Sequence, residues 1–339
     1  MSGSQRRAAP TLETVAAEAG VSRATVSRVI NDSPRVSPEV KAAVRQAITR
    51  LGYVPNRAAR SLVTRRTDTI AMVVTEPDTT FFSDPYFAHV VRATIPALEG
   101  TDVQLVLVMA QTKAEHARLT RYLQGQHVDG VLLMSLHGDD PLPRILQRAR
   151  VPTVSWGRPP RPLAHIPYVD ADNVGGGRQA VGHLLKVGRK RIATIAGPAD
   201  MCVGADRLLG YREAMREAGH DDRLVAHGDF SQQSGERAMD ELLAREPRLD
   251  GVFAASDLMA AGALRALRRA GRRVPDDVAV VGHDDLEVAR LTEPTLTTVH
   301  QPVDEMARTM TVMLLEQVHD GKEALPAVLP TYLVERSSA

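Results

Sequence analysis

Four side chains near the start of the chain share one face of a predicted helix and have the chemistry to contact nucleic acid. Arg23, Ala24, Ser27 and Arg28 recur at helical spacing within the sequence SRATVSRVI. Guanidinium groups and small polar side chains suit the base edges and phosphates of a DNA major groove. Short amphipathic helices with solvated arginines are also common on protein surfaces, so this helix alone leaves both interpretations open.

The elements that must position these side chains are a pair of short helices with a third helix behind them. Apolar residues at helical spacing predict the first helix, and Gly20 stands where a left-handed residue would end it. Ser22 can cap the second helix. A third helix is predicted over 37–51, with Gly52 just past its end. A further short helix, starting near 55, should order only when something holds it.

The charge of the chain is unevenly distributed. Residues 1–66 contain 12 Lys and Arg against 4 Asp and Glu, a net charge of +8, whereas the whole chain carries +1. The remainder is therefore acidic. A basic head on an acidic body indicates a footprint for nucleic acid. A basic membrane-binding arm would need exposed aromatic residues, and this head has only Tyr53.

Cysteine usage and hydropathy indicate the compartment. The chain has one cysteine, Cys202, which excludes an internal disulfide framework and fits a reducing environment. Neither an N-terminal apolar signal region nor an uncharged apolar run of about 18 residues is present. We expect a cytoplasmic, nucleoid-associated protein with no membrane partner.

Alternating apolar runs and amphipathic stretches after residue 67 predict two α/β lobes. A first series of apolar runs covers 69–75, 103–109, 128–134 and 151–156. A second series covers 191–197, 251–256 and 278–285, with helices predicted over 173–187, 205–219, 232–245 and 257–271. Such alternation is typical of parallel sheets covered by helices. Ligands of open α/β sheets bind at the carboxyl ends of the strands, so two facing sheets would enclose a cleft.

Motifs of catalysis are nearly absent. The stretch 175–180, GGGRQA, fits the G-x-G-x-x-A pattern of a dinucleotide site. However, Asp170 and Asp172 precede it, and their charge opposes a pyrophosphate at the helix N-terminus while suiting a helix cap. His283 has no second histidine at ligand spacing, and Cys202 is better explained as a pocket-wall or surface residue than as a nucleophile. We expect no enzyme, no cofactor and no metal site.

Several motifs resemble the LacI/GalR family of bacterial transcriptional repressors along essentially the whole chain. VSRATVSRVIN, VSPEV and LGYVPNRAARSL resemble the headpiece and hinge, and HLLKVGRKRIATIAGP, ASDLMAAGALRALRRAG and VPDDVAVVGHDD resemble the core. The resemblance implies a helix-turn-helix headpiece over 1–54, a hinge over 55–67 and a periplasmic-binding-protein-like core over 68–339. Lobe 1 would span about 68–164 and 292–326, and lobe 2 about 165–291 and 327–339. The chain would cross between the lobes near 161–168, 288–294 and 326–330.

The resemblance also implies which residues meet DNA. Bases would be read by Arg23, Ala24 and Arg28. Phosphate contacts would come from Ser22, Thr25, Ser27 and Asn31. Thr11 is also expected to bind DNA. The hinge helix would enter the minor groove with Asn56, Ala59 and Arg60 along it and Leu62 wedged into the central base step. Two chains would pair as a homodimer on a palindromic operator in double-stranded DNA.

By the same resemblance, polar and aromatic residues at the strand ends form an effector site. In lobe 1 the matching residues are Thr75, Glu76, Asp84, Phe87 and Arg158. In lobe 2 and its junction they are Arg207, Phe230, Ser256, Asp257, Asp284 and Gln301. Carboxylates and an arginine pair with sugar hydroxyls, and an aromatic ring covers the C–H face of a sugar. We therefore expect a small carbohydrate effector, a mono- or disaccharide.

Some of these residues also have structural explanations. Asp84 and Asp257 could be helix N-caps, Phe230 could belong to the core, and Asp284 or Asp285 could serve a helix N-terminus. The predicted function is a ligand-controlled repressor in which the effector changes the angle between the lobes and thereby the spacing of the hinges. The alternative is a free-standing sugar receptor without specific DNA binding.

Overall fold

Three helices near the N-terminus pack around a small apolar core. They are α1 (Leu12–Ala19), α2 (Arg23–Ile30) and α3 (Pro38–Leu51). Gly20 and Gly52 end α1 and α3 in the left-handed conformation, at φ 65° and 62°, as the sequence predicts. The core between the helices consists of Val15, Ala16, Val26, Val29, Val44, Ala47 and Tyr53. Because Val26 and Val29 face this core, the opposite face of α2 is left for solvent.

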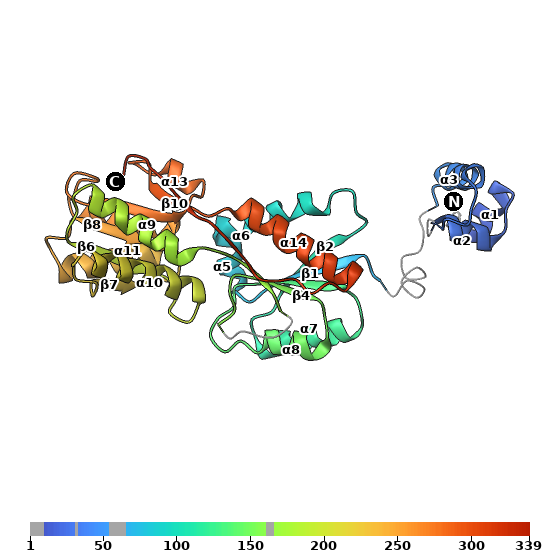
Figure 1. Ribbon diagram of the computed structural model, residues 1–339, viewed down its shortest axis with the longest axis horizontal. Coiled ribbons are helices and arrows are strands. Elements are labelled where there is room, and N and C mark those ends of the chain that lie inside the picture. The colour runs from blue at the N-terminus through green and yellow to red at the C-terminus, as the bar shows by residue number, and fades with distance from the viewer. Residues whose placement is uncertain (1–9, 31–32, 54–65, 161–165) are drawn as a thin grey trace, which may run out of the picture. The chain divides into compact units, whose positions relative to one another are not determined.

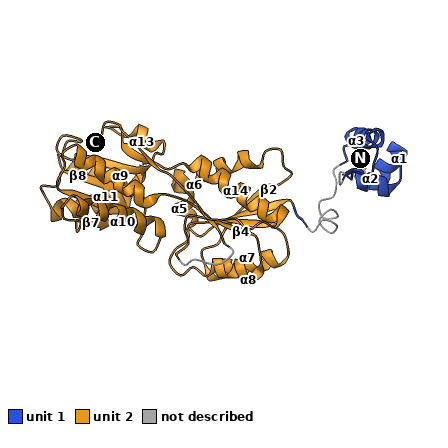
Figure 2. Ribbon diagram, in the orientation of Figure 1, with its two compact units in different colours: residues 1–67 blue, residues 68–339 orange. Residues whose placement is uncertain are grey.

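The computed structural model describes residues 10–30, 33–53, 66–160 and 166–339. The chain divides into two compact units, 1–67 and 68–339, which are coloured separately in Figure 2. The second unit contains two six-stranded sheets, each with its own helices, and these form the two lobes that Figure 1 shows.

Lobe 1 is built on a parallel sheet with the strand order β11-β5-β4-β3-β1-β2. The strands are β1 (Thr69–Val74), β2 (Gln104–Met109), β3 (Gly130–Met134), β4 (Thr153–Trp156), β5 (Tyr168–Ala171) and β11 (Ala327–Leu329). Alternate residues of β1 point to opposite faces. One face packs against α6 (Pro85–Thr94) and α14 (Val303–Asp320), and the other against α7 (Lys113–Gln124) and α8 (Leu142–Ala149). The short helices α5 (Asp78–Ser83) and η1 (Ile95–Leu98) flank α6 in the sequence.

Lobe 2 repeats this arrangement with the strand order β12-β10-β9-β8-β6-β7. Its strands are β6 (Ile192–Ala196), β7 (Val225–His227), β8 (Gly251–Ala254), β9 (Ala279–Asp284), β10 (Thr297–His300) and β12 (Tyr332–Val334). All of these pairings are parallel except β10 with β12. Helices α9 (Asn173–Lys186) and α10 (Cys202–Glu217) cover one face, and α11 (Gln232–Arg245) and α12 (Asp257–Arg269) cover the other. Helix α13 (Val288–Leu291) packs beside α12.

Two of the three expected lobe crossings lie elsewhere in the structure. Strand β5 pairs with β4 and so belongs to lobe 1, and the chain crosses only after residue 171. Strand β10 pairs with β9 in lobe 2, so the second crossing falls at about 301–302 rather than near 288–294. The third crossing, between β11 and β12, lies at the expected place near 330. The sequence of a short strand does not show which sheet the strand joins, because this depends on its pairing with neighbouring strands.

The glycines of the GGGRQA stretch serve helix packing and capping. A Cβ on Gly177 would lie 2.6 Å from the carbonyl oxygen of Arg207 on α10, so α9 and α10 need glycine where they touch. Asp172 caps α9 by accepting a hydrogen bond from the Gly175 amide at 2.8 Å. The expectation that the aspartate serves as a cap is therefore confirmed.

Candidate functional site

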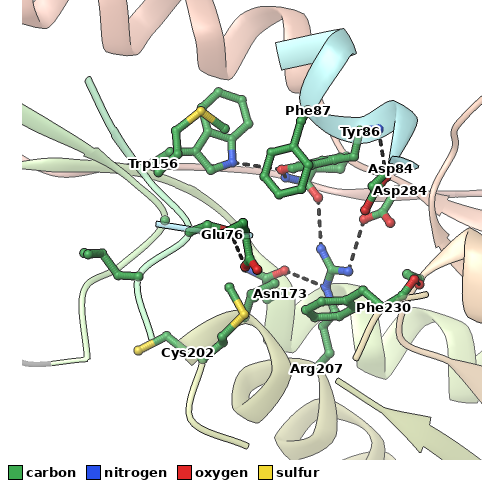
Figure 3. A pocket seen from close by; sticks show the side chains of 18 of the residues that line it. Glu76, Asp84, Tyr86, Phe87, Trp156, Asn173, Cys202, Arg207, Phe230 and Asp284 are labelled. Atoms are coloured by element: carbon green, nitrogen blue, oxygen red, sulfur yellow. Dashed lines mark hydrogen bonds and ion pairs between the residues drawn. The ribbon is translucent and has the colours of Figure 1, made fainter. Parts of the chain in front are cut away.

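A pocket lies where the carboxyl ends of the strands of both sheets come together. It spans about 920 Å³ when the open solvent at its mouth is included. Most of the predicted effector residues line it: Glu76, Asp84, Phe87, Arg158, Arg207, Phe230, Ser256, Asp284 and Gln301. Figure 3 shows those of them that it labels, Glu76, Asp84, Phe87, Arg207, Phe230 and Asp284, around one space.

Arg207, on α10, is the most highly connected side chain of the pocket. Its Nε donates to the Asn173 carbonyl oxygen at 2.9 Å, and its terminal nitrogens donate to the Ala255 backbone carbonyl at 2.6 Å and to Gln301 Oε1 at 2.9 Å. It also forms an ion pair of 3.1 Å with Asp284, visible in Figure 3. A guanidinium has five N–H donors, so these contacts fix its orientation and leave one donor for a ligand.

Tyr86, at the start of α6, is a pocket residue that the sequence analysis missed. Its hydroxyl accepts hydrogen bonds from Trp156 Nε1 at 2.8 Å and from Gln301 Nε2 at 2.9 Å. Burial raises its pKa, so the hydroxyl stays protonated. Because two N–H groups occupy the lone pairs of the oxygen, its own proton is free to be donated to a ligand oxygen. Tyr86 also ties lobe 1 to Gln301 at the lobe crossing.

Three of the predicted carboxylates face the pocket, from Glu76 and Asp84 in lobe 1 and Asp284 in lobe 2, and Asp170 and Asp229 also line it. Burial raises the pKa of Asp84 to about 6, and the neighbouring Asp284 and Glu76 carboxylates act in the same direction. Asp84 also caps α6 by accepting from the Tyr86 amide at 2.9 Å. Asp84 therefore caps α6 and also forms part of the pocket wall.

Aromatic rings form walls of the pocket on both lobes. Phe87 and Trp156 come from lobe 1, and Phe230 comes from the loop after β7 in lobe 2. The ring of Phe230 lies against Gly197, where a Cβ would meet ring atoms at 2.4–2.5 Å. The Trp156 ring packs edge-on against Tyr86, with centroids 6.3 Å apart. A flat ligand between such rings can present its C–H faces to aromatic surfaces.

Two predicted effector residues lie outside the pocket wall. Asp257 is fully buried in lobe 2, where its carboxylate accepts from the Leu286 amide at 2.7 Å and from the Thr298 hydroxyl at 2.5 Å. It anchors the β9–α13 loop, and Ser256 is the residue that caps α12. Thr75 donates its hydroxyl to the backbone carbonyls at the end of β3. Both side chains are used by their own lobe, so the prediction that they face the ligand is corrected.

Other lining residues were not predicted from the sequence. Ser135, Asp170 and Asn173 supply polar groups, and Met134 and Met201 supply sulfur-containing surface. Cys202, for which the sequence analysis favoured a place in a pocket wall or on the surface, also lines the pocket. Asp170 illustrates the network, since its carboxylate accepts from the Arg158 amide at 3.0 Å and from the Asn173 amide nitrogen at 2.9 Å. Asp170 lies within β5 and Asn173 begins α9, so their signal in the sequence was the polar stretch VDADN (169–173) at the end of an apolar strand.

The headpiece presents the predicted DNA-facing side chains on the outer face of α2. Ser22, Arg23, Ala24 and Arg28 are exposed, while Thr25 and Ser27 are half-buried. The Thr25 amide donates to Ser22 Oγ at 3.1 Å, and Thr11 caps α1. Asn31, Asn56, Ala59, Arg60 and Leu62 lie outside the described residues.

Metal and membrane sites were searched within the described ranges. No cluster of three or more histidine, cysteine, aspartate or glutamate side chains suited to a metal ion occurs in them. None of the helices in these ranges combines the length and apolar character needed to cross a bilayer.

Comparison with known proteins places both units in one family. Residues 11–56 match the model for bacterial regulatory proteins of the lacI family, and residues 181–339 match a periplasmic binding protein-like domain. The HTH-type transcriptional regulator CelR of Thermobifida fusca is 55% identical over 98% of this chain and 99% of its own length. The HTH-type transcriptional repressor PurR of Salmonella newport is 36% identical over 97% and 96%.

Solved structures agree with these sequence relatives. A complex of the regulator CelR with cellobiose shares 53% identity, covers 97% of this chain and 100% of that one, and superposes with a TM-score of 0.78. A Lac repressor dimer bound to operator and an anti-inducer shares 27% identity over 98% and 99%, with a TM-score of 0.83. The presence of the DNA-binding region confirms the regulator over the free-standing receptor, and the relatives are regulators rather than enzymes. The chain belongs to the lacI family of bacterial regulatory proteins and is a DNA-binding transcriptional regulator.

Proposed function

We propose that this regulator binds cellobiose, or a closely similar disaccharide, in the pocket between its lobes and that the sugar controls its affinity for an operator. The observation that carries the proposal is the convergence of Arg207 and several carboxylates, among them Glu76 and Asp284, between aromatic walls. A relative that shares 53% identity over 97% of the chain has been solved as a cellobiose complex.

The chemistry of the pocket suits a flat glucose disaccharide. The equatorial hydroxyls of such a sugar project from the edges of its rings and can donate hydrogen bonds. The carboxylates of Glu76, Asp84 and Asp284 in the pocket wall can accept them. Its C–H faces are apolar and can pack on Phe230 and Trp156.

We propose that two chains bind a palindromic operator through the exposed face of α2. Arg23, Ala24 and Arg28 would contact bases, and Ser22, Thr25, Ser27 and Thr11 would contact phosphates or hold the helices that do. Sugar binding would close the lobes and release the DNA. Linkage then requires the operator to weaken sugar binding by the same factor.

Fluorescence anisotropy on promoter DNA tests this proposal. The full chain is titrated onto labelled DNA from its own promoter at fixed salt, with cellobiose, maltose, lactose or glucose. The proposal expects a specific complex that cellobiose releases at lower concentration than the other sugars. A specific complex that no disaccharide changes, together with no sugar binding by calorimetry, would refute the effector assignment.

A further inference from the structure

His137 bridges two carboxylates that belong to different lobes. It lies on the loop after β3 in lobe 1, with Nε2 2.9 Å from Glu76 Oε1 and Nδ1 3.0 Å from Asp200 Oδ2. Glu76 is part of the pocket wall, whereas Asp200 lies on the loop between β6 and α10 of lobe 2. Ionised carboxylates only accept hydrogen bonds, so both contacts require an imidazolium, which donates from both ring nitrogens.

Further bonds join the lobes beside this bridge. The Gly138 amide, next to His137, donates to the Asp200 carbonyl at 2.8 Å. Arg158, after β4 of lobe 1, donates to both carboxylate oxygens of Asp206 on α10 at 2.7 Å. Asp200 lies two residues before α10 and Asp206 lies on it, so both links hold the helix that carries Arg207.

We propose that His137 is a positioning residue for the effector site: it latches Asp200 of lobe 2 to Glu76 of lobe 1 and so holds the pocket closed around a bound sugar. This inference rests on the proposed effector function of the pocket. Ser135 Oγ and His137 Nε2 both donate to Glu76 Oε1, at 2.9 Å each, and so fix the orientation of the carboxylate. His137 therefore acts through Glu76 and through lobe closure rather than by touching the ligand.

The charges around His137 give the latch a direction of pH dependence. The facing groups are Glu76 from the loop after β1 and Asp200 from lobe 2, Asp139 and Asp140 follow on its own loop, and Asp84 stands behind Glu76. The hydrogen bond to Glu76, followed by that to Asp200, raises the pKa of His137 to about 9 in the closed lobes. Opening the lobes removes Asp200 but leaves Glu76, which belongs to the same lobe as His137, so the pKa of His137 falls only part of the way back toward its ordinary value. The latch is therefore complete at pH 6.5 and is lost as the pH rises through about 9.

Titrations of the full chain with cellobiose between pH 6.5 and pH 9 test the latch. The His137 side chain is 35% exposed, so solvent screening reduces its effect, and we expect about tenfold weaker binding at pH 9 than at pH 6.5 for the native protein. His137→Gln should bind about tenfold more weakly at pH 6.5 and show no further loss at pH 9. Asp200→Asn should do the same. His127→Gln, an exposed histidine stacked on Tyr122, is the matched control and should keep the native profile.

Hydrogen–deuterium exchange without sugar separates failure of the latch from failure of the effector proposal. At pH 7, residues 135–141 of the native chain should exchange more slowly than those of His137→Gln, because opening frees the Gly138 amide. Faster exchange in both latch variants supports the latch even if no sugar binds. Native exchange together with a native pH profile in His137→Gln would overturn it. Circular dichroism verifies that each variant is folded.

Discussion

Replacing Gly197 with alanine should weaken sugar binding by displacing one wall of the pocket. Gly197 follows β6, and a Cβ built on it would lie 2.4 Å from Cζ and 2.5 Å from Cε1 of Phe230. Non-bonded carbon atoms prefer separations of about 3.5–4.0 Å, so the Phe230 ring must move by about 1 Å or more. The backbone of Gly204, 3.2 Å from the same point, limits any shift of the new methyl group in the other direction.

The expected loss follows from the contact that the ring provides. An aromatic contact contributes about 0.5–1.5 kcal/mol beyond the area that it buries. Removing about 40 Å² of ring from contact with the sugar costs about 1 kcal/mol more. We therefore expect a total of about 2 kcal/mol, or a Kd for cellobiose raised about 30-fold.

Tryptophan fluorescence and calorimetry measure this change. The chain has one tryptophan, Trp156, which lines the pocket and reports on its occupancy. Gly182→Ala is the matched control because Gly182 is exposed on α9 and a Cβ there has no neighbour within 4 Å. It should leave the Kd unchanged and stabilise the helix by about 0.5–1 kcal/mol.

A double-mutant cycle shows whether the effect acts through Phe230. In a Phe230→Ala background the ring is already missing, so Gly197→Ala should cause little further loss. The reasoning is refuted if Gly197→Ala binds cellobiose within twofold of the native protein, or if the two substitutions weaken binding additively.

Three further substitutions test the buried network, the carboxylates and the headpiece. Arg207→Met leaves the buried Asp284 carboxylate without its cation and should destabilise the protein by about 3 kcal/mol in urea unfolding; an unchanged midpoint contradicts this. With the pKa of Asp84 at about 6, cellobiose affinity should fall about tenfold from pH 7 to pH 5, because the protonated carboxyl no longer accepts freely from hydroxyls. In Asp84→Asn, which retains the helix cap, calorimetry should show a cellobiose affinity that does not change between pH 7 and pH 5. If the affinity of this variant falls as in the native protein, Asp84 is not the titrating group. Arg28→Ala should lower operator affinity by about 1–3 kcal/mol in anisotropy, and an equal loss on unrelated DNA would argue against base reading.

Periodicity predicted the sheets and helices well but not which sheet each short strand joins. The apolar run 69–75 appears as β1 (Thr69–Val74), and the helix predicted over 232–245 appears as α11 (Gln232–Arg245). The predicted lobe bounds place β5, β10 and β11 in the wrong lobes. Each is three or four residues long and is placed by hydrogen bonding to a neighbour, which a single sequence does not display.

Within the site, strand-end position identified polar residues but not their partners. Asp257 and Asp284 both follow or end buried strands, yet Asp257 is used to hold Leu286 and Thr298 while Asp284 reaches Arg207. Tyr86 stands next to Phe87, which the family resemblance implies as a ligand residue, and the sequence alone does not show that both aromatic residues reach the pocket. Only the folded turn shows that the Tyr86 hydroxyl meets donors from β4 and from the lobe crossing.

An unusual backbone conformation sets the direction of several of these side chains. Their residue types do not reveal this conformation in the sequence. Ser135, Phe230 and Asp284 all line the pocket and all have positive φ, at 62°, 68° and 113°. Residues with a Cβ adopt this region at a cost of about 1–3 kcal/mol, so glycine would be the usual expectation there. Contacts such as the ion pair from Arg207 to Asp284 and the bond from Ser135 to Glu76 hold two of them in place. Strain concentrated at three strand ends of one pocket is consistent with selection for what these side chains reach rather than for stability. The direction of a strand-end side chain therefore depends on its loop, and a sequence that predicts the strand end leaves that direction open.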